Sequence, residues 1–274
     1  MQELIDLALA EDVGAGDLTA AAVVPAGARA RARIVQKAEG VVAGLDVAEA
    51  VFRRLEIALR WRAHAADGDE GDAGRLVAEI AGPAAPLLAG ERVALNFLGR
   101  LSGVATLTAR YVEAVAGTGA AILDTRKTTP GLRALEKRAV AAGGGRNHRA
   151  GLYDALLVKE NHAALAGGIA AAARAAVAAA DRTGLEVVVE CASLDEVDEA
   201  LAAGAPRVLL DNLPLAELRE AVARARGRAQ TEASGGITLD TVRAIAETGV
   251  DYVSVGALTH SAPALDLSMS LDPL

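Results

Sequence analysis

Short apolar runs alternate with amphipathic stretches along the chain from Gly119 onward. The apolar runs, each typical of a buried β-strand, are AAILDT, DALLVKEN, EVVVEC, RVLLDN, AQTEAS and DYVSVG. Helical periodicity separates them in GLRALEKRAVAA, AALAGGIAAAARAAVAAAD, SLDEVDEALAAG, PLAELREAVARA and TLDTVRAIAETG. Strands that alternate with helices and lack a polar face indicate a parallel sheet covered by helices. The pattern therefore predicts an α/β fold with a barrel-like sheet.

The segment before Pro86 follows a different pattern. ELIDLALAED predicts an amphipathic helix, and ARARIVQKAEGVVAG predicts two strands around a turn at Glu39-Gly40. DVAEAVFRRL is again helical, and ALRWRAHAADGDEGDAGRLVAEIAG predicts two strands around an acidic, glycine-rich turn. From Pro86 a long helical pattern runs to Val115. These elements predict an α+β module ahead of the repeating units.

Polar residues stand at the carboxyl ends of the strands predicted after Gly119. They are Asp124, the run Lys159-Glu160-Asn161, Glu190, Asp211, Glu232 and Ser254. The carboxyl ends of barrel strands meet at one rim, where the active sites of barrel enzymes form. Because loops are polar in any protein, one or two such residues would need no further explanation. The whole series favours a functional rim.

Basic side chains gather at the same predicted rim. Arg126 and Lys127 follow Asp124, the glycine-rich segment GGGRNHR supplies Arg146, His148 and Arg149, and Lys159 ends the next strand. Arginine offers a two-pronged donor to carboxylates and phosphates, and lysine offers a mobile point charge. This rim therefore predicts a site for a polyanion. The acids Glu190 and Asp211 could hold ribose hydroxyls or a Mg²⁺ that accompanies a pyrophosphate.

Two glycine-containing turns add a phosphate signal. Ser234-Gly235-Gly236 lies between a predicted strand and helix, and Gly256-Ala257 follows the last predicted strand. Small residues let backbone N–H groups approach a phosphate near a helix N-terminus. In barrels, the loops after the last two strands are a frequent phosphate site. Glycine is common in any strand–helix turn, but two such turns in the last two units together favour a phosphate site.

Composition narrows the class of partner. The chain has 28 Lys and Arg against 36 Asp and Glu, a net charge of −8, which argues against nucleic acid as the main partner. No apolar run is long enough to span a membrane, and the N-terminus MQELIDLALAEDVG lacks the basic start of a signal peptide. Cys191 is the single cysteine, so no intrachain disulfide can form. We expect a soluble, cytoplasmic protein.

Other candidate sites fail on spacing. His64, His162 and His260 are not spaced with acids or Cys191 as a zinc site, and His162 is expected to cap the turn after Lys159. Cys191 is expected to be a small packed residue and not a nucleophile. The acidic run DGDEGD lacks the spacing of a calcium loop and is expected to be a solvated hairpin.

Several motifs together resemble one enzyme family. EDVGAGDLT, NFLGRLSGVAT, DTRKTTPGLRALEKRAV, GGGRNHRAGLYDALLVKENH, VVVECAS, VLLDN, EASGGI and YVSVGALTHSAPALDLS are similar to quinolinate phosphoribosyltransferases, the decarboxylating nicotinate-nucleotide pyrophosphorylases. The resemblance runs from Leu4 to the C-terminus and implies an N-terminal α/β sandwich over residues 1–105. An open, incomplete α/β barrel would follow over residues 106–264, with the tail 265–274 returning to the first domain. Family members are homodimers, sometimes assembled further into hexamers, in which the neighbouring subunit completes each site.

The resemblance also implies roles for individual residues. The two carboxylates of quinolinate would be held by Arg126, His148, Arg149 and Lys159, with Arg92 resembling the arginine that reaches across the dimer. Phosphoribosyl pyrophosphate would be bound by Thr125, Lys127, Glu190, Asp211, Ser234, Gly235, Gly236, Val255, Gly256 and Ala257. Of these, Lys127, Glu190 and Asp211 would be catalytic, and the two acids would hold Mg²⁺, partly through the substrate. By itself, Arg92 reads as an ordinary arginine on a helix surface.

Two alternatives remain at this level. One is a paralogous phosphoribosyltransferase of the same fold acting on another substrate, such as the type associated with molybdate transport. The other is a non-catalytic sensor of a phosphate-bearing ligand that uses the same rim. The complete basic set argues against the first, and the presence of Glu190 and Asp211 beside the phosphate turns argues against the second.

Overall fold

The computed structural model describes residues 1–274 and divides into two compact units. The first unit contains residues 1–109, 130–144 and 262–274, and the second contains residues 110–129 and 145–261. The segment 130–144, which the sequence assigned to the barrel domain, thus belongs to the first unit.

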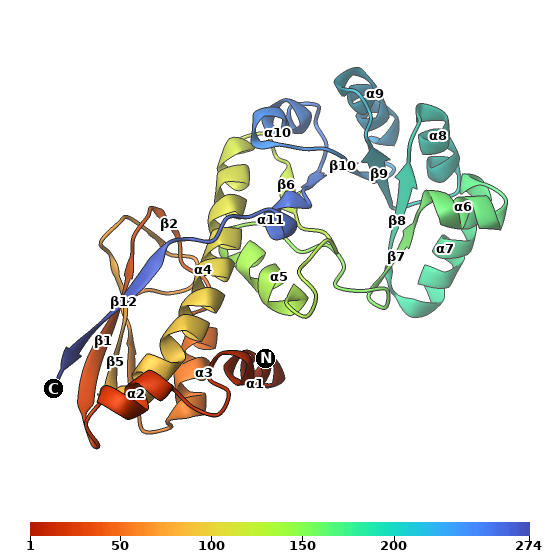
Figure 1. Ribbon diagram of the computed structural model, residues 1–274. Helices are drawn as coiled ribbons and strands as arrows, with labels where there is room; N and C mark the ends of the chain where they lie inside the picture. Colours follow the sequence, from red (N-terminus) through yellow and green to blue (C-terminus); the bar gives the residue numbers. More distant parts are fainter. The chain divides into compact units, whose positions relative to one another are not determined.

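The first unit is built around an antiparallel sheet (Figure 1). Its strands are β1 (Arg29–Gln36), β2 (Gly40–Val41), β3 (Arg60–Ala63), β4 (Glu70–Gly71), β5 (Leu76–Pro83) and β12 (Leu267–Pro273). Its helices are α1 (Gln2–Asp12), α2 (Leu18–Val23), α3 (Leu45–Leu55), α4 (Ala84–Ala114, of which residues 110–114 belong to the second unit) and α5 (Arg133–Ala142). The main sheet has the order β12-β1-β5-β3, so the C-terminal tail forms one of its edges.

The two strands predicted on either side of the turn at Glu39-Gly40 are present as β1 and β2, but β1 does not pair with β2. Instead β1 pairs with β5 and β12, and the short β2 pairs with β4. Gln36 at the end of β1 is fully buried, and its side-chain amide donates to the carbonyls of Gly40 and Gly71. These bonds hold the chain after β1 away from the strand it has just left, against the acidic hairpin.

The helix α5 belongs to the first unit because its buried face is built to contact α4. Glu136 of α5 is fully buried and forms an ion pair with Arg100 of α4 at 2.7 Å. At the end of α5, a Cβ on Gly143 would lie 2.3 Å from the carbonyl oxygen of Ala105. No side chain fits at that distance, so Gly143 allows a close approach of two backbones. The sequence pattern showed the helix but not the surface on which it packs.

The second unit is a six-stranded parallel sheet with the order β6-β11-β10-β9-β8-β7. The strands are β6 (Ala121–Leu123), β7 (Ala155–Val158), β8 (Glu186–Cys191), β9 (Arg207–Asp211), β10 (Gln230–Ser234) and β11 (Tyr252–Ser254). The helices are α6 (Glu160–Ala166), α7 (Ile169–Thr183), α8 (Leu194–Ala202), α9 (Leu215–Ala225), α10 (Leu239–Ala246) and α11 (Ala257–His260). Because β6 and β7 are the edges of one curled sheet, this is the open, incomplete α/β barrel that the sequence predicted (Figure 1).

The stretch predicted as one helix after Lys159 is two helices. Gly167 and Gly168 both adopt positive φ angles, 87° and 118°, between α6 and α7. Two consecutive residues with positive φ end a right-handed helix, and glycine adopts a positive φ at little energetic cost. No single helix of the chain is long and apolar enough to span a membrane; α6 and α7 meet that test only as a pair, bent by 97° at this break.

Candidate active site

A cavity of about 210 Å³ opens at the carboxyl ends of the parallel strands. We call it the first cavity. Its lining consists of Thr125, Arg126, Lys127, His148, Arg149, Leu157, Lys159, Glu190, Leu209, Asp211, Glu232, Ser234 and Ser254. The four side chains predicted to hold the quinolinate carboxylates therefore line one cavity, together with the acids Glu190 and Asp211. A parallel sheet produces this gathering because the carboxyl ends of all its strands lie at the same edge.

The strand register separates the lining into a rim and a floor. Asp211 pairs with Ser234 at the ends of β9 and β10, so both lie at the rim. Glu232 pairs with Leu209 two residues earlier and is fully buried. The prediction that Glu232 is a strand-end residue of the rim is therefore wrong. Since side chains alternate along a strand, Glu232 and Ser234 face the same way, and Glu232 lies one layer below.

The GGGRNHR loop, Gly143–Arg149, runs along the open edge of β6. Arg146 forms a parallel bridge with Leu123, with its N–H donating to the carbonyl of Ile122 at 2.8 Å. The buried carboxylate of Asp124 accepts the backbone N–H of His148 at 2.7 Å. These bonds fix the backbone while the Arg146 side chain is exposed and His148 and Arg149 line the first cavity. Asp124 thus anchors the loop, and the loop is held by backbone pairing more than by glycine flexibility.

The cations of the first cavity are electrostatically poised for an anion. Burial, followed by repulsion from Arg126, lowers the pKa of the Arg149 guanidinium from its usual value, although Asp154 and Glu190 partly oppose this. A bound carboxylate would relieve both the lost hydration and the repulsion. Lys159 forms an ion pair with Glu190 at 2.5 Å across the mouth of the cavity. His162 accepts the backbone N–H of Lys159 at 3.0 Å, which confirms its predicted capping role.

A second cavity of about 270 Å³ lies beside the first. It is lined by Thr125, Lys127, Ser234, Gly235, Gly236, Ile237, Thr238, Ser254, Val255, Gly256, Ala257 and His260. Both glycine-containing turns that predicted a phosphate site meet here. The two cavities share four lining residues, namely Thr125, Lys127, Ser234 and Ser254. A ligand in each cavity would therefore contact the same small set of side chains, with Lys127 between them.

Two residues of this region escaped the sequence analysis. His260 lines the second cavity, although its position had been weighed only as a zinc ligand. Asn212 is the one non-glycine residue with a positive φ, 56°, and its amide donates to the Asp211 carboxylate at 2.9 Å. A Cβ on Gly235 would lie 2.2 Å from the Asn212 side chain, so Asn212 packs on the Ser234-Gly235-Gly236 turn and also orients Asp211. In the sequence, the position of Asn212 directly after an acidic residue at a strand end could have indicated this role.

Arg92 is not one of these lining residues. It is an exposed residue of α4 in the first unit, and neither cavity of the second unit includes it. No group of three or more His, Cys, Asp or Glu side chains is placed to hold a metal ion. Glu190 and Asp211 are two carboxylates in one cavity, which matches the way Mg²⁺ is bound by one or two protein carboxylates together with substrate phosphates.

Cys191 is expected to be inert in the native protein. It is fully buried, and burial, followed by repulsion from nearby Glu side chains, raises its pKa to about 12. Only the thiolate reacts with disulfide reagents, so labelling at pH 8 should be at least ~100-fold slower in the folded protein than in denaturant. Spectrophotometric thiol titration measures both rates. Rapid labelling of the folded protein would show an accessible, activated thiol instead.

An α/β barrel with a cationic cavity next to a glycine-lined cavity is the arrangement expected of an enzyme that joins an anionic substrate to a phosphate-bearing one. The comparisons specify the family. Residues 17–102 match the description "Quinolinate phosphoribosyl transferase, N-terminal domain", and residues 104–270 match the C-terminal domain of the same family. The chain belongs to the quinolinate phosphoribosyltransferase family.

Individual members of the family are similar to this chain over almost its full length. The chain is 44% identical to a probable nicotinate-nucleotide pyrophosphorylase (carboxylating) of Bacillus subtilis, covering 99% of this chain and 93% of that one. The crystal structure of NadC from Streptococcus pyogenes superposes with a TM-score of 0.93 at 41% identity, covering 99% and 96% of the two chains. The nicotinate-nucleotide pyrophosphorylase from Francisella tularensis gives 0.92 at 38% identity, covering 99% and 95%.

Proposed function

We propose that this protein transfers the phosphoribosyl group of phosphoribosyl pyrophosphate to quinolinate, with release of pyrophosphate and CO₂, giving nicotinate mononucleotide. It is then a pentosyltransferase of de novo NAD biosynthesis. The observation that carries the proposal is the pair of adjoining cavities, one cationic and one lined by glycine turns, that share Lys127. Family membership over both domains supports the same reaction.

The first cavity fits quinolinate. A dicarboxylate needs several fixed donors, and Arg126, Arg149 and Lys159 supply them around one cavity. The lowered pKa of Arg149 marks a guanidinium that has given up hydration without gaining a full countercharge. Binding a dianion there replaces the missing hydration and offsets the repulsion between the two arginines.

The second cavity fits the 5′-phosphate end of phosphoribosyl pyrophosphate. Ser234 ends β10, and Gly235 and Gly236 lie between β10 and α10, so their backbone N–H groups lie near a helix N-terminus. Glu190 and Asp211 at the rim of the first cavity would accept the ribose hydroxyls. They would also hold Mg²⁺ jointly with the pyrophosphate, and the ion would supply positive charge that neutralises the leaving group.

The reaction then follows from charge. As pyrophosphate departs, positive charge develops at the ribose C1, and Lys127 stabilises the negative charge on the leaving group. The ring nitrogen of quinolinate attacks C1 and becomes cationic. This cation draws the electron pair from the bond to the adjacent carboxylate, CO₂ leaves, and the ring carbon takes a proton. The protein's main contribution is to align two anions that otherwise repel each other.

A homodimer in the cytoplasm completes the proposal. Arg92 belongs to the first unit, and by the family resemblance it would serve the site of the neighbouring subunit. In that arrangement Arg92 would add a further donor for quinolinate. Assembly of dimers into a hexamer would leave these sites unchanged.

Product analysis tests the reaction. Purified protein with phosphoribosyl pyrophosphate, Mg²⁺ and quinolinate should form nicotinate mononucleotide and pyrophosphate in equal amounts, detected by chromatography. Nicotinate in place of quinolinate should give no product, because it lacks the second carboxylate. Absence of nicotinate mononucleotide from quinolinate would reject the proposal in favour of a paralogous transferase or a ligand sensor.

A further inference from the structure

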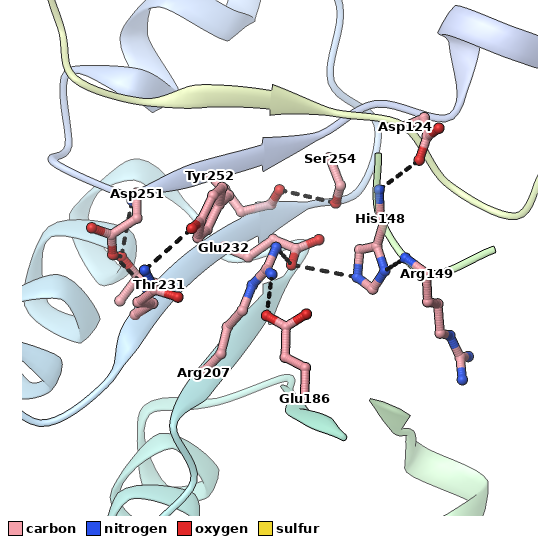
Figure 2. A network of polar contacts seen from close by, with 12 residues as sticks. Asp124, His148, Arg149, Glu186, Arg207, Thr231, Glu232, Asp251, Tyr252 and Ser254 are labelled. Carbon is pink, nitrogen blue, oxygen red and sulfur yellow. Dashed lines mark hydrogen bonds and ion pairs between the residues drawn. The ribbon is translucent and has the colours of Figure 1, made fainter. Parts of the chain in front are cut away.

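A column of charged side chains runs through the interior of the barrel below the first cavity (Figure 2). Arg207 at the start of β9 is almost fully buried and pairs with Glu186 at 2.8 Å and with Glu232 at 2.6 Å. Its guanidinium also lies 4.1 Å from the centre of the Tyr252 ring. Barrel interiors are normally filled by layers of branched apolar side chains. Here the ion pair of Arg207 and Glu232 and the Tyr252 ring lie among such side chains.

Stability does not account for this column. Moving two charges out of water costs hydration free energy, and the attraction between the charges seldom exceeds this cost. Proteins in which well-packed apolar side chains replace such a pair are often at least as stable. Glu232 shows this cost directly, because burial raises its pKa even though Arg207 and the Ser254 hydroxyl favour the ionised form. The buried ion pair of Arg207 and Glu232 is therefore expected to have a role other than packing.

The upper end of the column is His148. Its Nε2 lies 3.6 Å from the Glu232 carboxylate, and both side chains are buried. On the other side of the ring, Nδ1 accepts the backbone N–H of Arg149 at 2.7 Å. An acceptor nitrogen carries no proton, so the ring proton is on Nε2, toward Glu232. The two ring nitrogens thus link the buried carboxylate to the backbone of Arg149.

We propose that Glu232 is a positioning residue, held by Arg207, which keeps His148 in the Nε2-protonated tautomer and thereby aims Arg149 into the first cavity. In the other tautomer, two N–H groups would face each other across 2.7 Å, and the loop would have to move. A carboxylate beside Nε2 favours the proton on that nitrogen. Asp124 accepts the preceding N–H of the same loop and Asp154 accepts those of Ala150 and Gly151, so the His148 contact adds the constraint at Arg149.

The effect expected on the quinolinate KM rests on the proposed function. The effect expected on the His148 tautomer does not. Loss of Glu232 should leave the glycine turns of the second cavity in place, although Ser254, which lines that cavity, also hydrogen-bonds Glu232. The expected change is therefore a higher KM for quinolinate with an unchanged KM for phosphoribosyl pyrophosphate. Loss of one such orienting contact should raise the quinolinate KM about tenfold.

The test uses a variant that removes the column without leaving a buried charge alone. Arg207→Leu with Glu232→Leu is neutral and apolar, and should fold with a thermal midpoint close to that of the unaltered protein. Arg53→Leu with Glu49→Leu, an exposed ion pair on α3, is the matched control. Where the double variant does not fold, Glu232→Gln carries the test, because its amide removes the charge and nearly preserves the shape.

Two readouts decide the outcome. Nitrogen-15 NMR of the ligand-free protein, assigned with His148→Gln, should show Nε2 protonated and Nδ1 unprotonated, and a mixture of tautomers in the Leu pair. The quinolinate KM should rise about tenfold in that variant and not in the control. A folded variant with the same tautomer and the same quinolinate KM overturns the proposal. If the unaltered protein does not use quinolinate, the proposed function fails, yet the NMR result still decides the role of Glu232.

Discussion

Replacing Arg149 by alanine is expected to lower kcat/KM for quinolinate by about 10²–10³-fold, because truncating one partner of a buried, hydrogen-bonded charge pair costs ~2–5 kcal/mol. Most of the change should be in the quinolinate KM. The KM for phosphoribosyl pyrophosphate should change little, since Arg149 lines the first cavity and not the second. Steady-state kinetics with each substrate varied in turn measures all three quantities.

Arg146→Ala is the matched control for that variant. Arg146 lies in the same loop and loses the same atoms, but its side chain is exposed and lines neither cavity. Its contribution to the loop is the backbone bridge to Leu123, which alanine keeps. We expect kinetic constants within about twofold of the unaltered protein, as for most surface substitutions. Equal effects of the two variants, or no effect of Arg149→Ala, would remove Arg149 from the substrate site.

Replacing Lys127 by alanine should act mainly on kcat. Lys127 lines both cavities, so it lies where the proposed quinolinate and phosphate sites would adjoin. The hydroxyl of Thr259 donates to the backbone carbonyl of Lys127 at 2.8 Å, which holds its main chain in place. A charge that stabilises the leaving group acts chiefly in the transition state, and removing one such group typically lowers kcat about 10²–10³-fold.

Two control variants, Lys127→Arg and Lys37→Ala, accompany Lys127→Ala. The arginine variant keeps the charge and should recover part of kcat, whereas Lys37 is an exposed lysine of the first unit and should be neutral. Pyrophosphate release, followed by a coupled assay, gives kcat for each protein. A Lys127→Ala enzyme with normal kcat and a raised quinolinate KM would place Lys127 with the dicarboxylate and not with the leaving group.

Local pattern predicted most of the second unit. All six apolar runs after Gly119 are parallel strands, because strands covered on both faces leave a continuous apolar signal. The sequence alone could predict that the basic residues of DTRKT, GGGRNHR and LLVKEN lie close together, because each motif lies next to a strand end and the strand ends share one edge of the sheet. This argument needs only the order of the elements.

Pairing and packing were less predictable. The pattern predicted strands on either side of Glu39-Gly40 but not their partners, because β1 pairs with β5 and β12, which are far away in sequence. Glu232 was placed at the rim because the pattern gives a strand's extent only to within a residue or two, and such a shift moves a side chain to another layer. Arg207, at the start of a predicted strand, gave no sign that its guanidinium lies inside the barrel.

By itself the sequence determined the family, the kinds of element and the group of side chains that could bind an anion, because periodicity, motif order and charge are all local properties of the chain. Only the tertiary structure decided that Asp124 anchors the loop of His148 and Arg149, that Lys127 lies between two cavities, and that Glu232 and Arg207 stand beneath the site. Those facts depend on distances between residues remote in sequence. Such distances arise when strands choose partners and register, which no single segment specifies.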